Sequence, residues 1–161
     1  MIIRVQKEDF DPDALVAACG AGDPTVGAVV SFTGLVRASD GMDTDDPVTA
    51  LTLEHYPGMT ERALKDIGTQ ATARFGLKDA VVVHRVGRLS VGARIVLVVA
   101  AASHRQAAFQ GADFMMDYLK TEAPFWKREE RASGSGHWVD ARDSDTAARA
   151  RWAHAPRDPA L

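Results

Sequence analysis

The residues best suited to chemistry are gathered in one short stretch, residues 120–129 (KTEAPFWKRE). It holds two lysines, Lys120 and Lys127, on either side of Pro124. If the proline turns the chain back, both ammonium groups face one anionic pocket, where neighbouring positive charges would lower a lysine's pKa and make its neutral, nucleophilic form accessible. The structural alternative is that the cations complement a helix C-terminus and the two aromatic residues anchor the core. Composition alone leaves both interpretations open.

Three further residues are candidates for binding an anion. His104 and Arg105 lie at the expected first turn of a helix, where free backbone N–H groups and the positive end of the helix dipole favour phosphate. Arg37 follows a glycine turn at the end of an expected strand, a position that can present its guanidinium to phosphate. Without other information, a solvated surface position is the simpler interpretation of all three.

Other polar motifs point away from a metal or nucleotide site. His84 and Arg85 are neighbours in a strand pattern, which directs their side chains to opposite faces, so we expect a structural role for both. The histidines and the single cysteine, Cys19, have no ligand spacing typical of a metal site, and no phosphate loop or dinucleotide fingerprint is present. We expect neither a metal nor a cofactor.

The composition bounds the class of protein. A chain of 161 residues with 46% hydrophobic content has the size of one domain with one core. Its formal net charge of -3 argues against general attraction to nucleic acid or an anionic membrane. The first ten residues lack an apolar signal region and the longest apolar run, residues 95–102, is too short to span a membrane. We expect a cytoplasmic protein.

Helices must position most of the candidate residues. A short helix is expected from the Asp-Pro-Asp start at residues 11–13 to residue 18, and a longer one over residues 59–75, where apolar residues recur every four positions before Gly76. Ser103 and Gln106 form an expected capping box that opens a third helix, which ends at Pro124. This helix carries Lys120 near its end. A polar helix is expected near residues 143–152.

Strand patterns lie between these helices. Residues 27–33 form an expected strand that Gly34 interrupts, followed by a mobile acidic loop over residues 37–47. Residues 49–55 alternate as a half-buried strand does, and residues 81–85 and 95–102 are further strands, the last one central and covered on both faces. A flexible loop at residues 133–136 precedes a short strand around Trp138. The mixed order favours an α+β (mixed α/β) fold over a doubly wound parallel sheet.

Taken together, the motifs FTGLVR, LTLEHYPGMTERAL, VVVHRVGRL, SHRQAAFQGADFMMDYLKTEAPFWKRE and HWVDAR resemble, in order and spacing, those of the molybdopterin synthase large-subunit family. The resemblance runs from about residue 27 to residue 152. It implies an α/β hammerhead-type sandwich. We expect a single domain over residues 1–152 and a disordered C-terminal tail over residues 153–161. Leu35 departs from the family pattern, since some relatives carry lysine there, so a contact made by that side chain is in doubt.

The resemblance also implies a function. Members of the family are sulfurtransferases that move sulfur from the Gly-Gly thiocarboxylate tail of a small ubiquitin-like subunit to cyclic pyranopterin monophosphate, which builds the dithiolene of molybdopterin in molybdenum cofactor biosynthesis. They form a homodimer at the core of a heterotetramer. Carried over by motif, the catalytic residues are Lys120 and Lys127, and the substrate-binding residues are Arg37, His104, Arg105, Arg128, Glu129 and Arg142.

Two alternatives remain open at this stage. One is a non-catalytic adaptor that only docks a ubiquitin-like tail in a groove with a cationic end. The other is a single-strand nucleic-acid module that uses Phe125, Trp126, Lys127 and Arg128, which the acidic net charge disfavours. 

The length of the third helix raises a further expectation. His104 and Lys120 are 16 residues apart, or about 24 Å along a continuous helix at about 1.5 Å per residue. One chain cannot bring both to one pterin site. Since the resemblance assigns both to that site and implies a homodimer, we hypothesise a composite site, with Lys120 and Lys127 from one chain and His104 and Arg105 from its symmetry mate.

Overall fold

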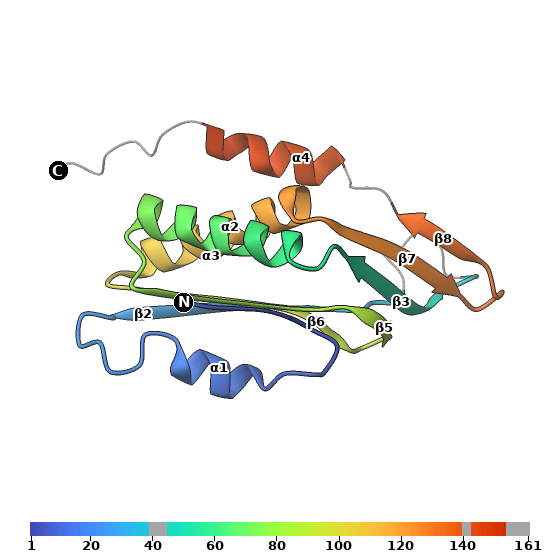
Figure 1. Cartoon of the computed structure of the whole chain (residues 1–161), viewed down its shortest axis with the longest axis horizontal. Helices are drawn as coiled ribbons and strands as arrows, with labels where there is room; N and C mark the ends of the chain where they lie inside the picture. The colour runs from blue at the N-terminus through green and yellow to red at the C-terminus, as the bar shows by residue number, and fades with distance from the viewer. Residues whose placement is uncertain (39–44, 140–142, 154–161) are drawn as a thin grey trace.

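The computed structural model describes residues 1–38, 45–139 and 143–153. Figure 1 shows the elements in chain order: β1 (Ile2–Gln6), α1 (Pro12–Ala18), β2 (Ala28–Leu35), β3 (Val48–His55), α2 (Met59–Phe75), β4 (Asp79–Arg85), β5 (Gly87–Ser90), β6 (Arg94–Ala102), α3 (Arg105–Glu122), β7 (Phe125–Arg131), β8 (Gly136–Val139), α4 (Asp143–Ala150) and the 3-10 turn η1 (Arg151–Ala153). The expected α+β class is confirmed.

The first sheet forms the centre of the molecule. Its strand order is β1-β4-β6-β2, with β1 and β4 parallel and the other pairs antiparallel. Helices α2 and α3 cover one face and α1 covers the other (Figure 1). Alternate residues of β6 enter the two cores, with Val98 on the α2–α3 side and Val99 on the α1 side, both fully buried. The predicted central position of residues 95–102 is therefore confirmed.

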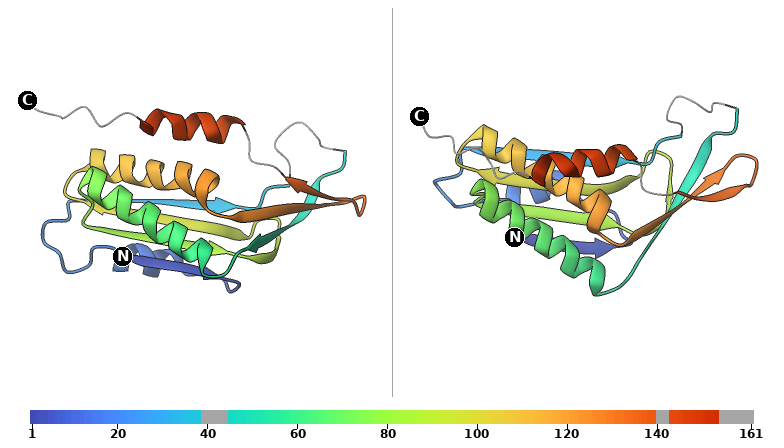
Figure 2. Two further views of the ribbon diagram at one scale, coloured as in Figure 1. Left: turned by 45° about the horizontal axis from the view of Figure 1, so that its top comes forward. Right: turned by 90° about the horizontal axis from the view of Figure 1, so that it is seen from above.

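The second sheet extends from one end of the first (Figures 1 and 2). Its order is β5-β3-β7-β8 and all its pairs are antiparallel. As the alternation of residues 49–55 predicts, Leu51 and Leu53 of β3 are buried on one face, while Thr52 and Glu54 occupy the other. Strand β7 follows α3 after only Ala123 and Pro124, so the end of the long helix leads directly into the second sheet.

Local sequence signals predict some boundaries and miss others. Helix α2 spans Met59–Phe75 and ends at Gly76, whose φ of 64° is the left-handed conformation that glycine adopts readily. The expected capping box at α3 is wrong, because the N-cap residue is His104 and its side chain makes no capping hydrogen bond. Gly34 does not end β2, which continues to Leu35 through a register shift between the two.

The C-terminal helix packs onto α3 (Figure 2). The Trp152 ring makes edge contacts with Phe75 and Phe114, and its Nε1 donates a 2.6 Å hydrogen bond to Asp117. Arg151 donates to the same carboxylate from two nitrogens. These bonds anchor the chain up to η1. The expectation of a disordered tail falls outside the described residues apart from Ala153, and no helix within the described ranges is long and apolar enough to cross a membrane.

Candidate active site

A cavity of about 540 Å³ lies where the second sheet meets the end of α3. It is lined by cationic, apolar and a few other polar residues: Arg37, Lys120, Lys127, Phe32, Gly34, Leu51, Leu53, His84, Ile95, Val96, Met116, Leu119, Ala123, Phe125, Val139, Ser144 and Asp145. Three of the residues predicted to act on the substrate, Arg37, Lys120 and Lys127, thus share one cavity.

The two lysines reach the cavity by different geometries. Lys120 lies in the last turn of α3, and Lys127 lies on β7, opposite Leu53 on one side and Val139 on the other. Because directly paired residues of an antiparallel sheet share a face, the Lys127 side chain lies on the same face as these two cavity residues. The turn at Ala123 and Pro124 therefore brings a helix residue and a strand residue to one site.

Lys120 has a carboxylate partner. Its Nζ lies 3.2 Å from Oδ1 of Asp145, which belongs to α4 and also lines the cavity. A second ion pair between Arg149 and Glu122 ties the same two helices one turn further on. Helix α4 therefore contributes to the cavity wall and supplies a negative charge beside the three cationic side chains of the lining.

The apolar wall includes an aromatic pair. The His84 imidazole stacks on the Phe125 ring, with 3.8 Å between centroids and 19° between planes. Burial lowers the pKa of His84 from its ordinary value to about 4, so the ring is neutral near pH 7. Arg85, the next residue, points to the opposite face and donates to the carbonyl oxygens of Lys7 and Arg94. The predicted divergence of this pair is confirmed.

Alternation along β7 separates the remaining residues of the lysine-rich stretch. Trp126 and Arg128 lie on the face opposite to Lys127, where Arg128 pairs with Thr52 and Trp138. Glu129 shares the face of Lys127 but forms an ion pair with Arg131, at 3.3 Å, and does not line the cavity. Arg128 and Glu129, both predicted to contact substrate, thus lie outside the cavity of a single chain.

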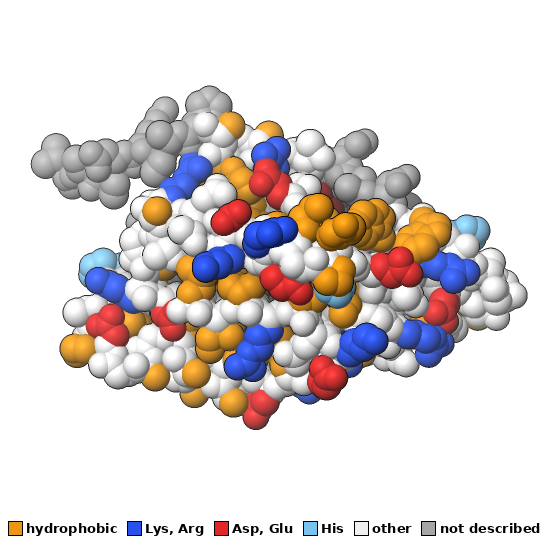
Figure 3. All heavy atoms as spheres, in the orientation of Figure 1, with side chains coloured by type: hydrophobic (Ala, Val, Ile, Leu, Met, Phe, Trp, Pro, Cys, Tyr) orange, Lys and Arg blue, Asp and Glu red, His pale blue; other side chains and the backbone are white. Residues whose placement is uncertain are grey.

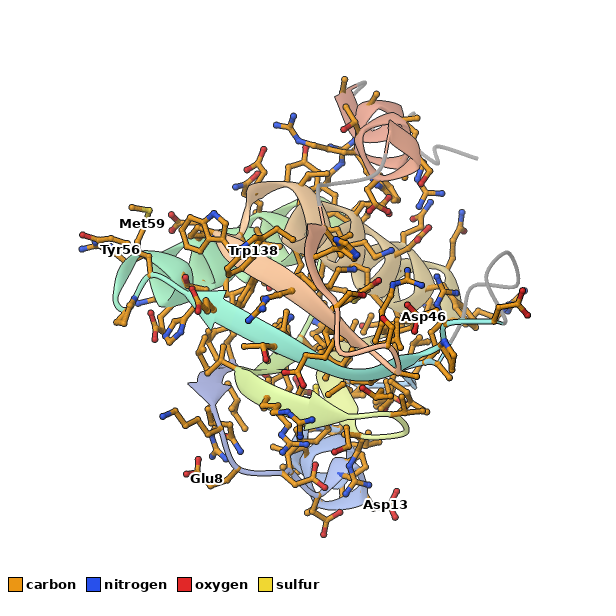
Figure 4. All side chains as sticks on the ribbon, turned by 90° about the vertical axis from the view of Figure 1, so that its right-hand side faces the viewer. Glu8, Asp13, Asp46, Tyr56, Met59 and Trp138 are labelled. Carbon is orange, nitrogen blue, oxygen red and sulfur yellow. The ribbon has the colours of Figure 1, made fainter. Side chains whose placement is uncertain are left out.

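Exposed apolar side chains lie on strands β7 and β8 of the second sheet and where β3 leads into α2. Tyr56, Met59, Trp126 and Trp138 are all about half exposed, and Figure 3 shows apolar side chains gathered over this end of the molecule. In Figure 4, Tyr56 and Met59 lie where β3 leads into α2, and Trp138 lies on β8 on the same side of the view, while Asp46 lies at the other end of β3.

The other predicted anion-binding residues lie far from this cavity. His104 and Arg105 are exposed at the start of α3, whose 18 residues span about 27 Å. Neither residue lines the cavity that contains Lys120. Arg142 falls outside the described residues. A single chain therefore does not unite the complete predicted set.

The site also contains residues that sequence reasoning did not select. Asp145 and Ser144 belong to the polar helix α4, and no residue spacing in the sequence indicates that this helix packs against α3. His84 was set aside as structural, although a histidine in a run of buried valines was a signal that could have been followed. Within the described ranges, His, Cys, Asp and Glu side chains form no group of three or more that could hold a metal ion.

Comparison with known proteins identifies the family. The model of the MoaE protein family matches residues 5–122. The chain belongs to the MoaE family. Two relatives named molybdopterin synthase catalytic subunit are those of Rhizobium meliloti (strain 1021), 53% identical over 93% of this chain and 94% of the relative, and of Pseudomonas aeruginosa, 50% identical over 94% of this chain and 99% of the relative. The MoaE relatives thus match nearly the whole chain.

Solved structures agree with the MoaE assignment. The molybdopterin biosynthesis MoaE protein from Burkholderia ambifaria superposes with a TM-score of 0.78 at 51% identity, covering 94% of this chain and 97% of that one. Molybdopterin synthase from Staphylococcus aureus gives a TM-score of 0.77 at 25% identity, covering 86% of this chain and 96% of that one. The two sheets and their helices are therefore those of the MoaE fold.

Proposed function

We propose that this chain is the catalytic subunit of a molybdopterin synthase. It transfers sulfur from the C-terminal thiocarboxylate of a small ubiquitin-like subunit to cyclic pyranopterin monophosphate and so forms the dithiolene of molybdopterin. The observation that carries the proposal is that Arg37, Lys120 and Lys127 share one cavity in a chain about half identical to proteins named molybdopterin synthase catalytic subunit.

The charges of the cavity suit the two reactants. A thiocarboxylate and a phosphate are both anions, and the cavity presents three cationic side chains beside an apolar wall of Leu51, Leu53 and Phe125. Exclusion of water by such a wall strengthens the attraction between fixed cations and bound anions. Holding both reactants in one cavity also removes much of the entropic cost of bringing them together.

Each cation has a proposed role. The thiocarboxylate sulfur attacks a pterin carbon and displaces an oxygen leaving group there. Water then cleaves the acyl C–S bond, so the sulfur stays on the pterin and the tail leaves as a carboxylate. Lys120 acts as general acid/base or stabilises the charge that develops on transfer, and Lys127 orients the tail or the pterin. Arg37 holds the phosphate, since a guanidinium matches phosphate oxygens in a two-pronged geometry.

The complete site is proposed to form in a homodimer at the core of a heterotetramer. Helix α3 is continuous between Arg105 and Lys120 and too long for both to reach one pterin. His104 and Arg105 of a second copy would then join the cavity that holds Lys120 and Lys127. Strand β2, an edge strand of the first sheet with exposed Val29, Phe32 and Leu35, supplies apolar surface for such a contact. The proposed location is the cytoplasm, which the single buried Cys19 suits.

Reconstitution tests the proposal. The protein is mixed with thiocarboxylated small subunit and cyclic pyranopterin monophosphate, and sulfur-containing pterin is measured by mass spectrometry. A parallel reaction with the carboxylate form of the small subunit is the control and should give no product. Tight binding of the thiocarboxylated subunit without any product would assign the chain to the adaptor class instead.

Strand β7 divides the four residues of the nucleic-acid alternative between two faces. Phe125 is stacked on His84 beside the cavity and Lys127 lies on the same face, while Trp126 and Arg128 face the other way. Stacking successive bases of a single strand requires aromatic residues and cations on one shared surface. The four residues therefore do not form the platform that this alternative needs.

A further inference from the structure

His84 lines the cavity with a polar side chain, and the proposed sulfur transfer assigns no role to this residue. It lies on β4, is only 5% exposed, and lines the cavity next to Phe125. A buried imidazole is costly unless its polar atoms have partners or face a polar space. The partners of its two nitrogens therefore indicate what the ring can do.

One nitrogen has a fixed partner. His84 Nδ1 lies 2.8 Å from the carbonyl oxygen of Arg85. A carbonyl oxygen can only accept, so Nδ1 carries the hydrogen and donates it. In a neutral imidazole the other nitrogen, Nε2, then has a free lone pair and is an acceptor.

The other nitrogen is not sealed inside the core. No described residue donates a hydrogen bond to Nε2, since the only contact of the ring nitrogens is the one to Arg85. Nε2 also keeps some contact with solvent. Because His84 is only 5% exposed and lines the cavity, the cavity is the space through which a donor would reach Nε2.

This acceptor differs from the other polar side chains around it. Arg37, Lys120 and Lys127 can only donate. The remaining acceptor side chains of the lining are Ser144 and Asp145, and Asp145 is paired with Lys120. A reactant with N–H groups needs an acceptor in the wall, and a neutral nitrogen supplies one without cancelling the positive charge that holds the anionic groups.

We propose that Nε2 of His84 accepts a hydrogen bond from an N–H group of a reactant in the cavity and thereby orients that reactant. The identity of the reactants rests on the proposed function. Two sources share this chemistry: a backbone amide of the Gly-Gly tail and a ring N–H of the pyranopterin. The acceptor, its tautomer and its place in the wall follow from the geometry of the chain.

Three substitutions separate this role from a merely structural one. His84→Asn retains a donor near the position of Nδ1 but does not reach the cavity. His84→Gln places an amide oxygen near the position of Nε2. His84→Phe keeps the aromatic stack on Phe125 and removes both polar atoms.

Affinity and turnover are then measured for each variant. The probes are a synthetic peptide with a Gly-Gly carboxylate end and cyclic pyranopterin monophosphate, with thermal unfolding recorded in parallel. Loss of one neutral hydrogen bond should weaken binding of one probe by about 3- to 10-fold in the Asn and Phe variants. KM should rise more than kcat falls, and the Gln variant should recover part of the loss. The probe whose affinity falls identifies the source of the N–H group.

A measurement on the parent protein does not depend on how the variants fold. With ¹⁵N-labelled histidine, the Nε2 resonance of His84 should shift when one of the two probes saturates the protein. Parent-like binding by the Asn and Phe variants, or an Nε2 resonance that neither probe moves, would overturn the proposal. Losses that follow only thermal stability, equal in all three variants, would do the same.

The two proposals fail in different ways. If the parent makes no sulfur-containing pterin, the proposed function is wrong, while the two titrations and the Nε2 resonance still decide the hydrogen bond. If the parent makes product and His84 fails these tests, only the present inference is wrong. If the parent binds neither probe, both are wrong.

Discussion

Nζ of Lys120 and Oδ1 of Asp145 lie 3.2 Å apart, so an ion pair joins the last turn of α3 to the first turn of α4 at the cavity wall. An anionic reactant must compete with this carboxylate for the Lys120 ammonium. Because the Lys120 side chain is 51% exposed, the ion pair contributes only the small stabilising free energy of a solvent-exposed pair.

Asp145→Asn should therefore strengthen binding of the Gly-Gly carboxylate peptide by about 1.4- to 5-fold, because the competing charge is removed. Calorimetric titration measures the change. Asp66→Asn, an exposed position of α2, is the matched control and should bind like the parent. Weaker binding in Asp145→Asn would mean that the carboxylate helps to hold the reactant.

Lys120→Ala should reduce product formation by at least about 100-fold, the usual minimum for loss of a general acid/base. The fold should survive, since an exposed ion pair contributes little to stability. Pterin analysis and thermal unfolding measure the two effects. Lys65→Ala, on the exposed face of α2, should leave both unchanged. A fully active Lys120→Ala protein would remove this lysine from the mechanism.

Arg37→Ala should raise KM for cyclic pyranopterin monophosphate by about 10- to 100-fold, the range expected for a hydrogen bond to a charged group. The change in kcat should be smaller, because a phosphate contact is made before as well as during the reaction. Steady-state kinetics measure both constants, with Arg4→Ala on the exposed part of β1 as control. A pure kcat defect contradicts a phosphate-binding role.

Mixing inactive Lys120→Ala protein with inactive Arg105→Ala protein should restore activity. A heterodimer of the two would hold one intact composite site and one doubly damaged site, so up to about half of the activity per dimer should return. Subunit exchange is verified by mass spectrometry before the assay. Verified heterodimers without activity would show that both residues act within one chain.

The free energy of unfolding should fall between pH 6.5 and pH 4 because of His84. Burial lowers the pKa of His84 from 6.5 to about 4 in the folded chain, so only the unfolded chain takes up this proton in that window. The parent should lose stability relative to His84→Phe by up to about 1.4 kcal/mol per pH unit. Urea unfolding at several pH values measures the difference. A difference that is constant with pH would contradict the low pKa.

The sequence predicts those features whose signal lies within one element. Helix α2 and its end at Gly76 follow from a local apolar period and one glycine. Strand β7 escaped prediction because its residues are mostly charged, and it becomes a strand by pairing with β3, whose paired residues lie 70 or more positions earlier in the chain. Tertiary pairing overrides local propensity in such strands.

The same reasoning applies to the site. Lys120 and Lys127 were selected by motif, and the cavity contains both. The contribution of Asp145 could not be foreseen, since it depends on how α4 packs against α3 and no spacing along the chain encodes that contact. His84 was visible in the sequence, but the partners of its nitrogens became known only from the fold.

The two residues that join α3 to β7 place a constraint on evolution that concerns chain length more than residue identity. Successive residues of a strand face opposite sides of the sheet. Inserting or deleting one residue at Ala123 or Pro124 would therefore move every side chain of β7 to the other face. Trp126 and Arg128 would then enter the cavity and Lys127 would leave it. We expect this joint to accept many replacements in a mutational library and to reject nearly every insertion or deletion.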